Sequence, residues 1–241
     1  MTDFAVETED LEKRFDGFVA VKGVNLAVRR GEIFGFLGAN GAGKTTTIRM
    51  LCGLLLPTGG GGRVAGFDIW SESERIKQNI GYMSQKFSLY GDLTVAENIE
   101  FYAGVYGLSR ALLEEKRRRL LQEFGLRAQA NRLTRDLPLG YKQRLALGCA
   151  LLHDPQVIFL DEPTSGVDPE ARRGFWQVIY ELAEAGKTVF VTTHYMDEAE
   201  YCNRVAIMHQ GEIIAMDRPG ALKRALGKET MQDVFIHLVA A

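Results

Sequence analysis

Short apolar runs alternate with amphipathic, helix-like segments along most of the chain. This alternation is typical of parallel strands joined by crossover helices. The apolar runs that we expect to form strands, each bounded by turn residues, are 32–37, 157–160, 188–192 and 204–208. Residues 4–28, which precede them, are predicted to form antiparallel strands. The pattern therefore predicts an α/β fold with an N-terminal antiparallel β subdomain.

Two helices of the α/β part have recognisable ends. One is expected over residues 44–51, directly after a glycine-rich loop. The other begins at Asp168-Pro169, where an N-cap residue precedes a proline at the first helical position, and it stops at Gly186. The run 59–62 consists of four glycines, and we interpret it as a flexible turn.

Residues 88–153 have a different pattern, with helix signals and no convincing strand. Thr94-Val95-Ala96-Glu97 is a capping box that opens one helix. Ser109 can cap a second helix, and a third is expected to begin near Gly140. We predict one domain over residues 1–241, with a helical subdomain at 88–153 inserted into a core made of 1–87 and 154–241.

Composition limits the class of protein. Of the 241 residues, 46% are hydrophobic and 25% are charged, which is ordinary for a globular domain with a proper core. A net charge of −2 gives no sign of a non-specific nucleic-acid binder. The chain starts Met1-Thr2-Asp3, without the regions of a signal peptide, and no apolar run reaches the roughly 18 residues of a membrane span. If the protein works at a membrane, another chain or segment supplies the membrane part.

The three cysteines are scattered along the chain and have no metal-ligand spacing. Their number is odd, and we interpret Cys52, Cys149 and Cys202 as reduced cytosolic thiols packed in helices.

The strongest chemical signal is the glycine-rich loop between a predicted strand and a predicted helix. Its residues, which fit the pattern G-x-x-x-x-G-K-[ST], are Gly38, Ala39, Asn40, Gly41, Ala42, Gly43, Lys44 and Thr45, followed by Thr46. Glycines let successive backbone N–H groups face a phosphate, and the helix presents its positive N-terminus. Lys44 is expected to reach the β- and γ-phosphates, and the Thr45 hydroxyl to bind Mg²⁺. A purely structural glycine turn is the alternative.

Two adjacent carboxylates, Asp161 and Glu162, follow the buried apolar run 157–160. Such carboxylates are costly at the end of a buried strand unless they have a cationic or hydrogen-bonded task. Neighbouring side chains at a strand end diverge, so we expect separate roles. Asp161 can support Mg²⁺ through its water shell, and Glu162 can orient or deprotonate an attacking water. A helix cap is the simpler alternative for this pair.

His194 directly follows another predicted strand, and a lone histidine is usually structural. Ligands in open α/β sheets bind beyond the carboxyl ends of the strands, so residues that follow those ends are expected to lie together. The residues brought into one neighbourhood by this rule are Lys44, Asp161, Glu162 and His194.

Together these residues resemble the nucleotide-binding domain of ABC transporters, over nearly the whole chain. Residues 38–45 are similar to the family's Walker A motif and 157–162 to its Walker B motif. The resemblance implies a P-loop NTPase (RecA-like) core, with ATP and Mg²⁺ as cofactors. It implies that Gln85 binds Mg²⁺ and faces the transmembrane partner, that His194 senses the γ-phosphate and that Phe15 stacks on adenine. For Phe15, a packed strand residue is the alternative.

Two further segments are named by the resemblance. Ser165, Gly166, Val167 and Asp168 look like the D-loop. The signature, Leu-Ser-Gly-Gly-Gln in the family, which contacts the ATP of the opposite subunit, is replaced here by Leu137, Pro138, Leu139, Gly140 and Tyr141. Pro138 brings neither a hydroxyl nor an N–H, although proline suits a helix start. We therefore expect a slower or weaker composite site and reduced affinity of ATP-driven dimerisation.

The resemblance also implies a biological role. The segment from Asp161 to Pro169 and the tail 232–235 look most like exporters of the ABC type-2 class. The implied mechanism is that two cassettes close on two ATP molecules, drive paired transmembrane permease domains and reopen on hydrolysis. The second cassette is a homo- or heterodimer partner, and the place of work is the cytoplasmic side of the inner membrane, peripherally bound.

Three alternatives stay open. A soluble ABC ATPase of translation or DNA repair would use basic patches, for which 116–119 is the only candidate, and a solvated helix face explains that run more simply. We expect no nucleic-acid partner. A nucleotide kinase or GTPase would need a guanine-reading or acceptor-binding element, and neither is evident. The third is a non-catalytic cassette that uses ATP only to hold a dimer together. The presence of Glu162 and His194 disfavours this alternative, and Pro138 favours it.

Overall fold

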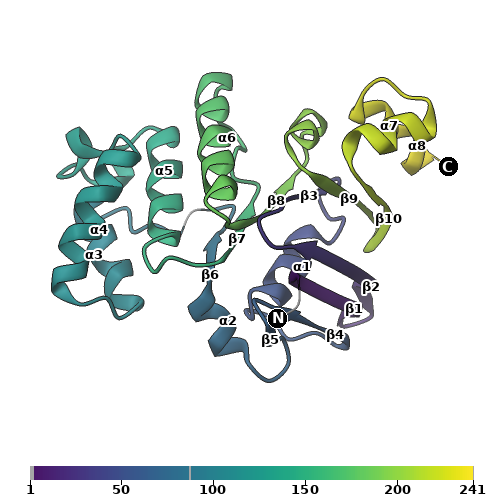
Figure 1. Ribbon diagram of the computed structural model, residues 1–241, viewed down its shortest axis with the longest axis horizontal. Coiled ribbons are helices and arrows are strands. Elements are labelled where there is room, and N and C mark those ends of the chain that lie inside the picture. The colour runs from purple at the N-terminus through teal and green to yellow at the C-terminus, as the bar shows by residue number, and fades with distance from the viewer. Residues whose placement is uncertain (1–2, 87, 241) are drawn as a thin grey trace.

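A six-stranded sheet forms the centre of the molecule (Figure 1). The structure is a computed structural model that describes residues 3–86 and 88–240, so Met1-Thr2 and the predicted limits at 87 and 241 lie outside the described residues. The strand order is β10-β9-β3-β8-β7-β6, with β10 antiparallel at one edge and the others parallel. The strands are β3 (Ile33–Leu37), β6 (Ile80–Met83), β7 (Val157–Asp161), β8 (Thr188–Thr193), β9 (Arg204–His209) and β10 (Glu212–Asp217). The predicted α/β fold is confirmed, and β6 and β10 are strands that the sequence analysis missed.

A second, antiparallel sheet lies on one side of the first, with strand order β2-β1-β4-β5. Its strands are β1 (Phe4–Phe15), β2 (Phe18–Arg29), β4 (Gly59–Val64) and β5 (Phe67–Asp68). The antiparallel N-terminal β subdomain is thus confirmed.

The interpretation of residues 59–62 as a flexible turn is wrong, because these glycines form the start of β4 and pair with β1. A side chain would not fit there. A Cβ placed on Gly60 would lie 2.1 Å from the Asp10 carbonyl oxygen, and one on Gly62 would lie 2.4 Å from that of Glu7. The glycines allow close approach of two backbones rather than mobility.

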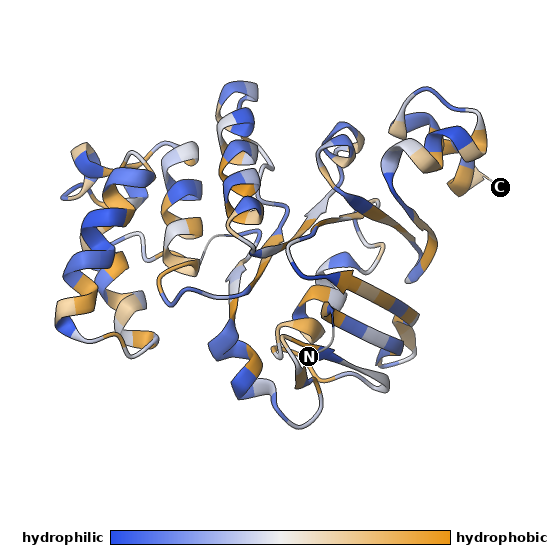
Figure 2. Cartoon of the chain, in the orientation of Figure 1, coloured by the Kyte–Doolittle hydropathy of each residue, from blue (hydrophilic) through white to orange (hydrophobic). Residues whose placement is uncertain are grey.

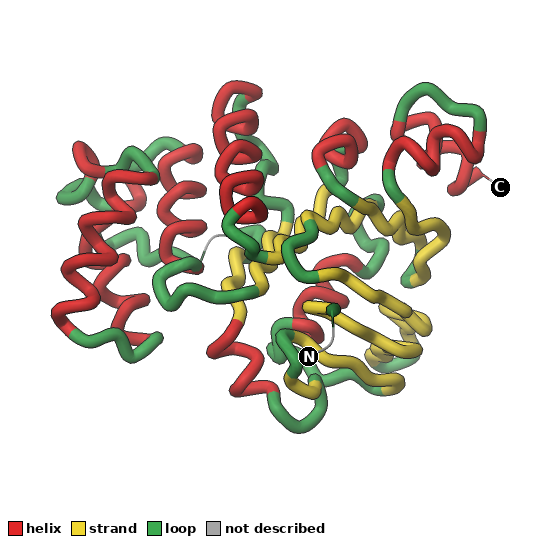
Figure 3. Tube along the Cα trace, viewed as in Figure 1, coloured by secondary structure: helices red, strands yellow, loops and turns green. Residues whose placement is uncertain are grey.

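Helices cover both faces of the central sheet (Figure 3). Successive side chains of a strand point to opposite faces of its sheet. On β3, Ile33 and Leu37 belong to a cluster with α5, α6 and α8, whereas Phe34 and Phe36 belong to one with α1 and the antiparallel sheet. The α-helices are α1 (Lys44–Leu51), α2 (Ser73–Asn79), α3 (Val95–Val105), α4 (Arg110–Glu123), α5 (Leu139–Ala150), α6 (Pro169–Glu184), α7 (Pro219–Leu226) and α8 (Met231–Ala240). The 3₁₀ turns are η1 (Arg127–Gln129), η2 (Thr134–Asp136) and η3 (Met196–Tyr201).

Local capping signals set the helix starts where the sequence analysis expected them. Thr94 and Glu97 form a capping box at α3, and the Ser109 hydroxyl accepts a hydrogen bond from the Leu112 N–H at α4. The Asp168 carboxylate accepts one from the Ala171 N–H at α6. On α6 the blue and orange residues alternate in Figure 2, because one face of this helix packs on the sheet.

The helices α3, α4 and α5 all lie within residues 88–153, at the left of Figure 1. No strand occurs among the residues that the structure describes between 88 and 153. The limits of a separate helical subdomain stay a prediction.

The three cysteines are buried free thiols. Cys149 lies in α5, but Cys52 and Cys202 are the residues that follow α1 and η3, so only one is inside a helix. Within residues 3–86 and 88–240, no helix is long and apolar enough to span a membrane.

Candidate functional site

The glycine-rich loop connects β3 to α1, and two of its glycines are required by geometry. Gly43 has φ = 107°, in the left-handed region that side chains disfavour, and a Cβ there would lie 2.6 Å from the Ala20 carbonyl oxygen. A Cβ on Gly38 would lie 2.4 Å from the Met208 carbonyl oxygen. The loop is therefore pressed between β2 and β9, and its backbone leads into the N-terminus of α1, which favours an anion.

Lys44, the first residue of α1, is folded back over the loop. Its Nζ donates hydrogen bonds to the carbonyl oxygens of Gly38 (2.7 Å) and Ala39 (3.2 Å). Glu162 Oε1 lies 3.4 Å from the same nitrogen, and the two side chains are only 4% and 6% exposed. Burial lowers the pKa of the Lys44 ammonium, and the charges of Glu162 and Asp161 oppose this effect. A phosphate group entering the loop offers this cation a stronger partner than two carbonyls.

Asp161 ends β7 and is held by two hydroxyls. Thr192 of β8 donates to its Oδ1 at 2.8 Å, and Thr45 of α1 donates to the same oxygen at 3.1 Å. Burial raises the pKa of the Asp161 carboxyl, and the hydrogen bonds from Thr192 and Thr45 lower it. The carboxylate is thereby fixed against the helix that carries the predicted metal ligand Thr45.

Glu162 follows immediately and faces a different set of partners. Its Oε2 accepts a hydrogen bond from Gln85 Nε2 at 3.0 Å and lies 3.1 Å from His194 Nδ1, while Oε1 faces Lys44. Its backbone is at φ = 50°, a left-handed conformation that costs a non-glycine residue about 1–3 kcal/mol. The two acids thus have separate partners, and the four residues expected in one neighbourhood do lie together.

Of the side chains described above, Lys44, Thr45, Gln85 and Glu162 line a cleft of about 530 Å³, whereas Asp161 and His194 are not among its lining residues. Its lining residues are Phe15, Phe18, Ala20, Asn40, Gly41, Ala42, Gly43, Lys44, Thr45, Thr46, Gln85 and Glu162. Most of the predicted nucleotide contacts therefore line this one cleft. Gly38 and Ala39 contribute their carbonyl oxygens to Lys44, as described above.

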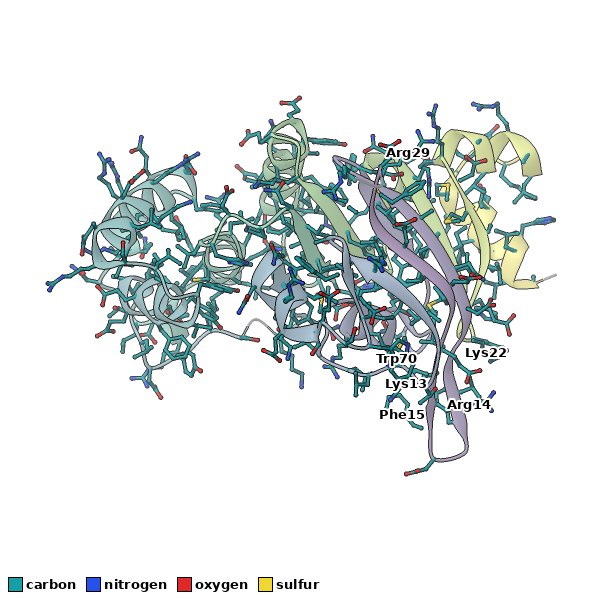
Figure 4. All side chains as sticks on the ribbon, turned by 60° about the horizontal axis from the view of Figure 1, so that its bottom comes forward. Lys13, Arg14, Phe15, Lys22, Arg29 and Trp70 are labelled. Atoms are coloured by element: carbon teal, nitrogen blue, oxygen red, sulfur yellow. The ribbon has the colours of Figure 1, made fainter. Side chains whose placement is uncertain are left out.

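The mouth of the cleft carries two exposed phenylalanines. Phe15 and Phe18 end β1 and begin β2, and they are direct cross-strand partners. Lys13 Nζ lies 5.2 Å from the centre of the Phe15 ring, and Figure 4 shows Lys13 and Phe15 on the same side of this hairpin. Phe18 was not predicted as a site residue. Asp16-Gly17, a two-residue hairpin turn, is the sequence signal that pairs the two rings.

The signature segment does not line this cleft. Pro138 is the N-cap residue of α5 and makes no side-chain cap, and Leu139 is 40% exposed. Leu137 is buried, and the Arg144 guanidinium lies over the Tyr141 ring. A Cβ on Gly140 would meet only Ala171 of α6, at 3.5 Å.

The D-loop segment connects Glu162 to α6. The Ser165 N–H donates to the Glu162 carbonyl oxygen, and Gly166 has φ = 75°. Val167 is buried, and Asp168 caps α6. The segment is therefore a turn that is hydrogen-bonded to the backbone of Glu162 and leads directly into α6.

The chemistry of the donor set fits magnesium. Thr45 Oγ1 and the Asp161 carboxylate are already in contact, and Gln85 contributes an amide to the same cleft. Hydroxyl, carboxylate and amide oxygens are hard ligands of the type that Mg²⁺ takes beside substrate phosphates.

A sequence profile of the ABC transporter family matches residues 21–165. This chain belongs to the ABC transporter family. Two curated relatives of this ABC cassette are ATP-binding proteins. The "Probable multidrug ABC transporter ATP-binding protein YbhF" of Escherichia coli is 52% identical over 97% of this chain, and the cassette spans 41% of that protein. The linearmycin resistance ATP-binding protein LnrL of Bacillus subtilis is 37% identical over 94% of this chain and 73% of its own length.

Solved structures of ABC cassettes share the fold. An ATP-binding subunit of an ABC transporter superposes with a TM-score of 0.87 at 28% identity, covering 98% of this chain and 99% of that one. The cassette MJ0796, solved as a dimer in a post-hydrolysis state with ADP and Pi, gives a TM-score of 0.80 at 26% identity, with 88% and 98% covered. The chain is an ATP-binding cassette of this family.

Proposed function

We propose that this cassette hydrolyses ATP with Mg²⁺ in the cleft beside the glycine-rich loop and powers an exporter. The observation that carries the proposal is the position of Glu162, which shares one oxygen between Gln85 and His194 and faces Lys44 with the other. A carboxylate fixed in this way can accept the proton of a water that attacks the γ-phosphorus.

In this proposal each residue of the site has a separate role. The loop N–H groups and Lys44 bind the β- and γ-phosphates, so Lys44 leaves Glu162 when the nucleotide enters. Thr45, Asp161 and Gln85 are the proposed holders of Mg²⁺, which neutralises charge on the phosphate oxygens when bound. His194 donates to the γ-phosphate and keeps Glu162 oriented. Phe15 stacks on adenine.

Steady-state phosphate release from Mg-ATP tests the proposal. Glu162→Gln keeps the shape and the hydrogen bond to His194 but removes the base, and we expect turnover to fall by about 100-fold or more with ATP binding intact. Glu170→Gln, an exposed change in the first turn of α6, is the matched control and is expected to keep full turnover. Equal turnover in the wild type and Glu162→Gln would remove Glu162 from the mechanism.

A second cassette is the proposed partner across the signature segment and the D-loop. The dimeric MJ0796 structure supports this arrangement, because the same fold there binds its copy. In our proposal the start of α5 and residues 165–168 of one subunit meet the ATP of the other. Light scattering of Glu162→Gln with and without Mg-ATP measures the association.

The membrane partner is proposed to dock beside Gln85. A groove of about 280 Å³ lies between β6, α3 and α5, and its walls are mostly apolar. Among its lining residues are Leu54, Ile80, Tyr82, Ser84 and Val105. Because Ser84 adjoins Gln85, a permease segment in this groove contacts the loop that carries a proposed metal ligand. Export of drug-like cargo is part of this proposal and is supported by the relatives' names, a multidrug ABC transporter protein and a linearmycin resistance protein. Attachment to the cytoplasmic side of the inner membrane and the type-2 class are further parts of this proposal.

A cassette that dimerises on ATP but hydrolyses slowly is the second candidate. Pro138 favours it, because the N-cap position of α5 has no side-chain hydroxyl to offer a phosphate of the opposite subunit. Losing one charge-assisted hydrogen bond costs about 1.5–3 kcal/mol at such a site. Pro138→Ser is expected to raise turnover and tighten ATP-driven dimerisation, and unchanged values for both count against this candidate.

A further inference from the structure

The buried face between α6 and η3 contains an unusual concentration of polar atoms without hydrogen bonds. In the described part of the chain, four buried side-chain nitrogen or oxygen atoms lack a hydrogen-bond partner. Three of them belong to Arg172 and Trp176 of α6 and to Glu198 of η3. Buried polar groups in native proteins are nearly always satisfied, so such a cluster calls for a functional explanation.

Glu198 is the centre of this cluster. It has no exposed surface, and its Oε1 accepts a hydrogen bond from the Thr164 hydroxyl at 2.5 Å. The Arg172 Nε lies 3.7 Å from the same oxygen, too far for a full hydrogen bond. A carboxylate buried with so few partners is costly for the fold, and a well-packed apolar residue would serve stability better.

The two residues joined by this bond belong to the two loops that carry the catalytic groups. Thr164 lies two residues after Glu162 in the loop that follows β7. Glu198 lies in the first turn after the loop that follows β8, and its N–H donates to the Tyr195 carbonyl oxygen. The Tyr195 ring in turn packs against the His194 ring, with ring centres 4.2 Å apart and the planes tilted by 37°. The loops therefore touch twice, at the Glu162–His194 contact and at the Thr164–Glu198 bond behind it.

We propose that Glu198 and Thr164 are positioning residues that fix the Glu162 loop against the His194 loop. With the Thr164–Glu198 hydrogen bond in place, Glu162 Oε2 stays within 3.1 Å of His194 Nδ1. Without this hydrogen bond, the two loops are connected only by the Glu162–His194 contact and by the sheet. Arg172, whose guanidinium also lies 4.2 Å over the Tyr195 ring, holds the same turn from α6. This inference rests on the proposed function for its effect on turnover.

Thr164→Val tests the bond with little change of shape, and Thr164→Ser restores the hydroxyl. We expect Thr164→Val to lower kcat about tenfold with the KM for ATP within about twofold, because a misplaced base affects the transition state more than binding. Thr164→Ser is expected to stay near the wild type. Asp197→Asn, a change of an exposed carboxylate on the same turn that lies 3.8 Å from Arg172, is the matched control and is expected to have no effect.

A paired apolar variant separates positioning from stability. Replacing both partners of a buried hydrogen bond with apolar groups is often neutral for stability. Thr164→Val combined with Glu198→Met is therefore expected to recover the unfolding midpoint lost in Thr164→Val while kcat stays low. Recovery of kcat together with the midpoint would overturn the proposal, and this variant carries the test if Thr164→Val alone does not fold.

A readout without hydrolysis keeps the inference separate from the proposed function. In protein labelled with ¹³C-histidine, the His194 signal is assigned by its loss in His194→Gln. We expect Thr164→Val to move this signal toward its position in Glu162→Ala, which has no carboxylate beside His194, and Thr164→Ser to leave it in place. A His194 signal that stays unmoved in Thr164→Val refutes the positioning role. Absence of turnover in the wild type refutes only the proposed function, and the His194 signal still decides this inference.

Discussion

Thr192→Val is the change for which the structure gives the most direct magnitude. The Thr192 hydroxyl is fully buried on β8. It donates to Asp161 Oδ1 at 2.8 Å and accepts from the Glu162 N–H at 2.8 Å. One hydroxyl therefore makes a hydrogen bond with each of the two neighbouring acids, with the side chain of Asp161 and with the backbone N–H of Glu162. Valine has nearly the same shape and suits a strand, so the change removes two hydrogen bonds and little else.

The cost of Thr192→Val follows from what is left unpaired. The bond to the carboxylate is worth about 1.5–3 kcal/mol, and an orphaned buried N–H costs about 1–3 kcal/mol. Burying the extra methyl group of valine returns about 0.8 kcal/mol. We therefore expect the free energy of unfolding to fall by about 3 kcal/mol.

Thr193→Val is the matched control for this change. Thr193 is also buried on β8, but its hydroxyl accepts only one neutral hydrogen bond, from the Tyr195 N–H at 3.0 Å. Its loss is expected to cost about 1 kcal/mol. Urea unfolding with an unchanged m value measures both variants. If the free energies of unfolding of Thr192→Val and Thr193→Val lie within about 0.5 kcal/mol of each other, the two hydrogen bonds of Thr192 do not have the expected strength.

The same variant has a pH signature. Burial already raises the pKa of Asp161 above its ordinary value of 3.8, and the hydrogen bond from Thr192 is the largest of three effects that lower it, the others coming from Thr45 and Lys44. Removing Thr192 raises that pKa further. A raised carboxyl pKa penalises the fold once the group ionises, so the stability difference from the wild type is largest near neutral pH. It is expected to narrow as the pH falls toward 3.8.

Three further predictions concern other parts of the chain. Phe15→Ala and Phe18→Ala are each expected to raise the KM for ATP about tenfold, since a stacked base contributes about 1–3 kcal/mol, while inhibition by inorganic triphosphate stays unchanged. Burial lowers the pKa of His153 below 6.5, so its contribution to stability is complete above pH 6.5 and is lost as the pH falls through the folded-state pKa. Glutamine does not titrate, so the free energy of unfolding of His153→Gln, measured in urea, is expected to fall less than that of the wild type between about pH 7 and pH 5. Gln210 and Gly211 form a two-residue hairpin turn with φ of 46° and 89°, a geometry that favours Asn-Gly. Gln210→Asn is therefore expected to raise the free energy of unfolding by about 0.5 kcal/mol, and a thermal midpoint below that of the wild type would contradict this expectation.

The parts of the fold that the sequence predicted are those with local signals. The run 33–37, the glycine loop and α1 follow one another without interruption, and the caps at Thr94, Ser109 and Asp168 act within three residues. β6 was missed because it follows α2 directly, with Ile80 serving as the C-cap of that helix and no glycine or proline between them. The four glycines of β4 indicated a flexible turn, because glycine is uncommon in strands, although they form part of one.

The site shows the same division between local and long-range information. Lys44, Asp161, Glu162 and His194 were placed together by a general rule about strand ends. The role of Thr192 was not predicted, because it lies in an apolar strand and its partner Asp161 is 31 positions away in the sequence. The Thr164–Glu198 bond spans 34 positions, and an acidic residue in a polar turn has no sequence feature that predicts burial. Such residues are visible only once the strand order brings their loops together.

The left-handed backbone of Glu162 has a consequence for attempts to make this cassette more robust. At φ = 50° a glycine or an asparagine would relieve part of the strain and would also remove a buried carboxylate. A directed-evolution screen that selects only for heat resistance would therefore be rewarded for discarding this residue. Stabilised variants of this chain need an ATP-turnover filter at every round, because a substitution that relieves the strain at this position also removes the proposed catalytic base.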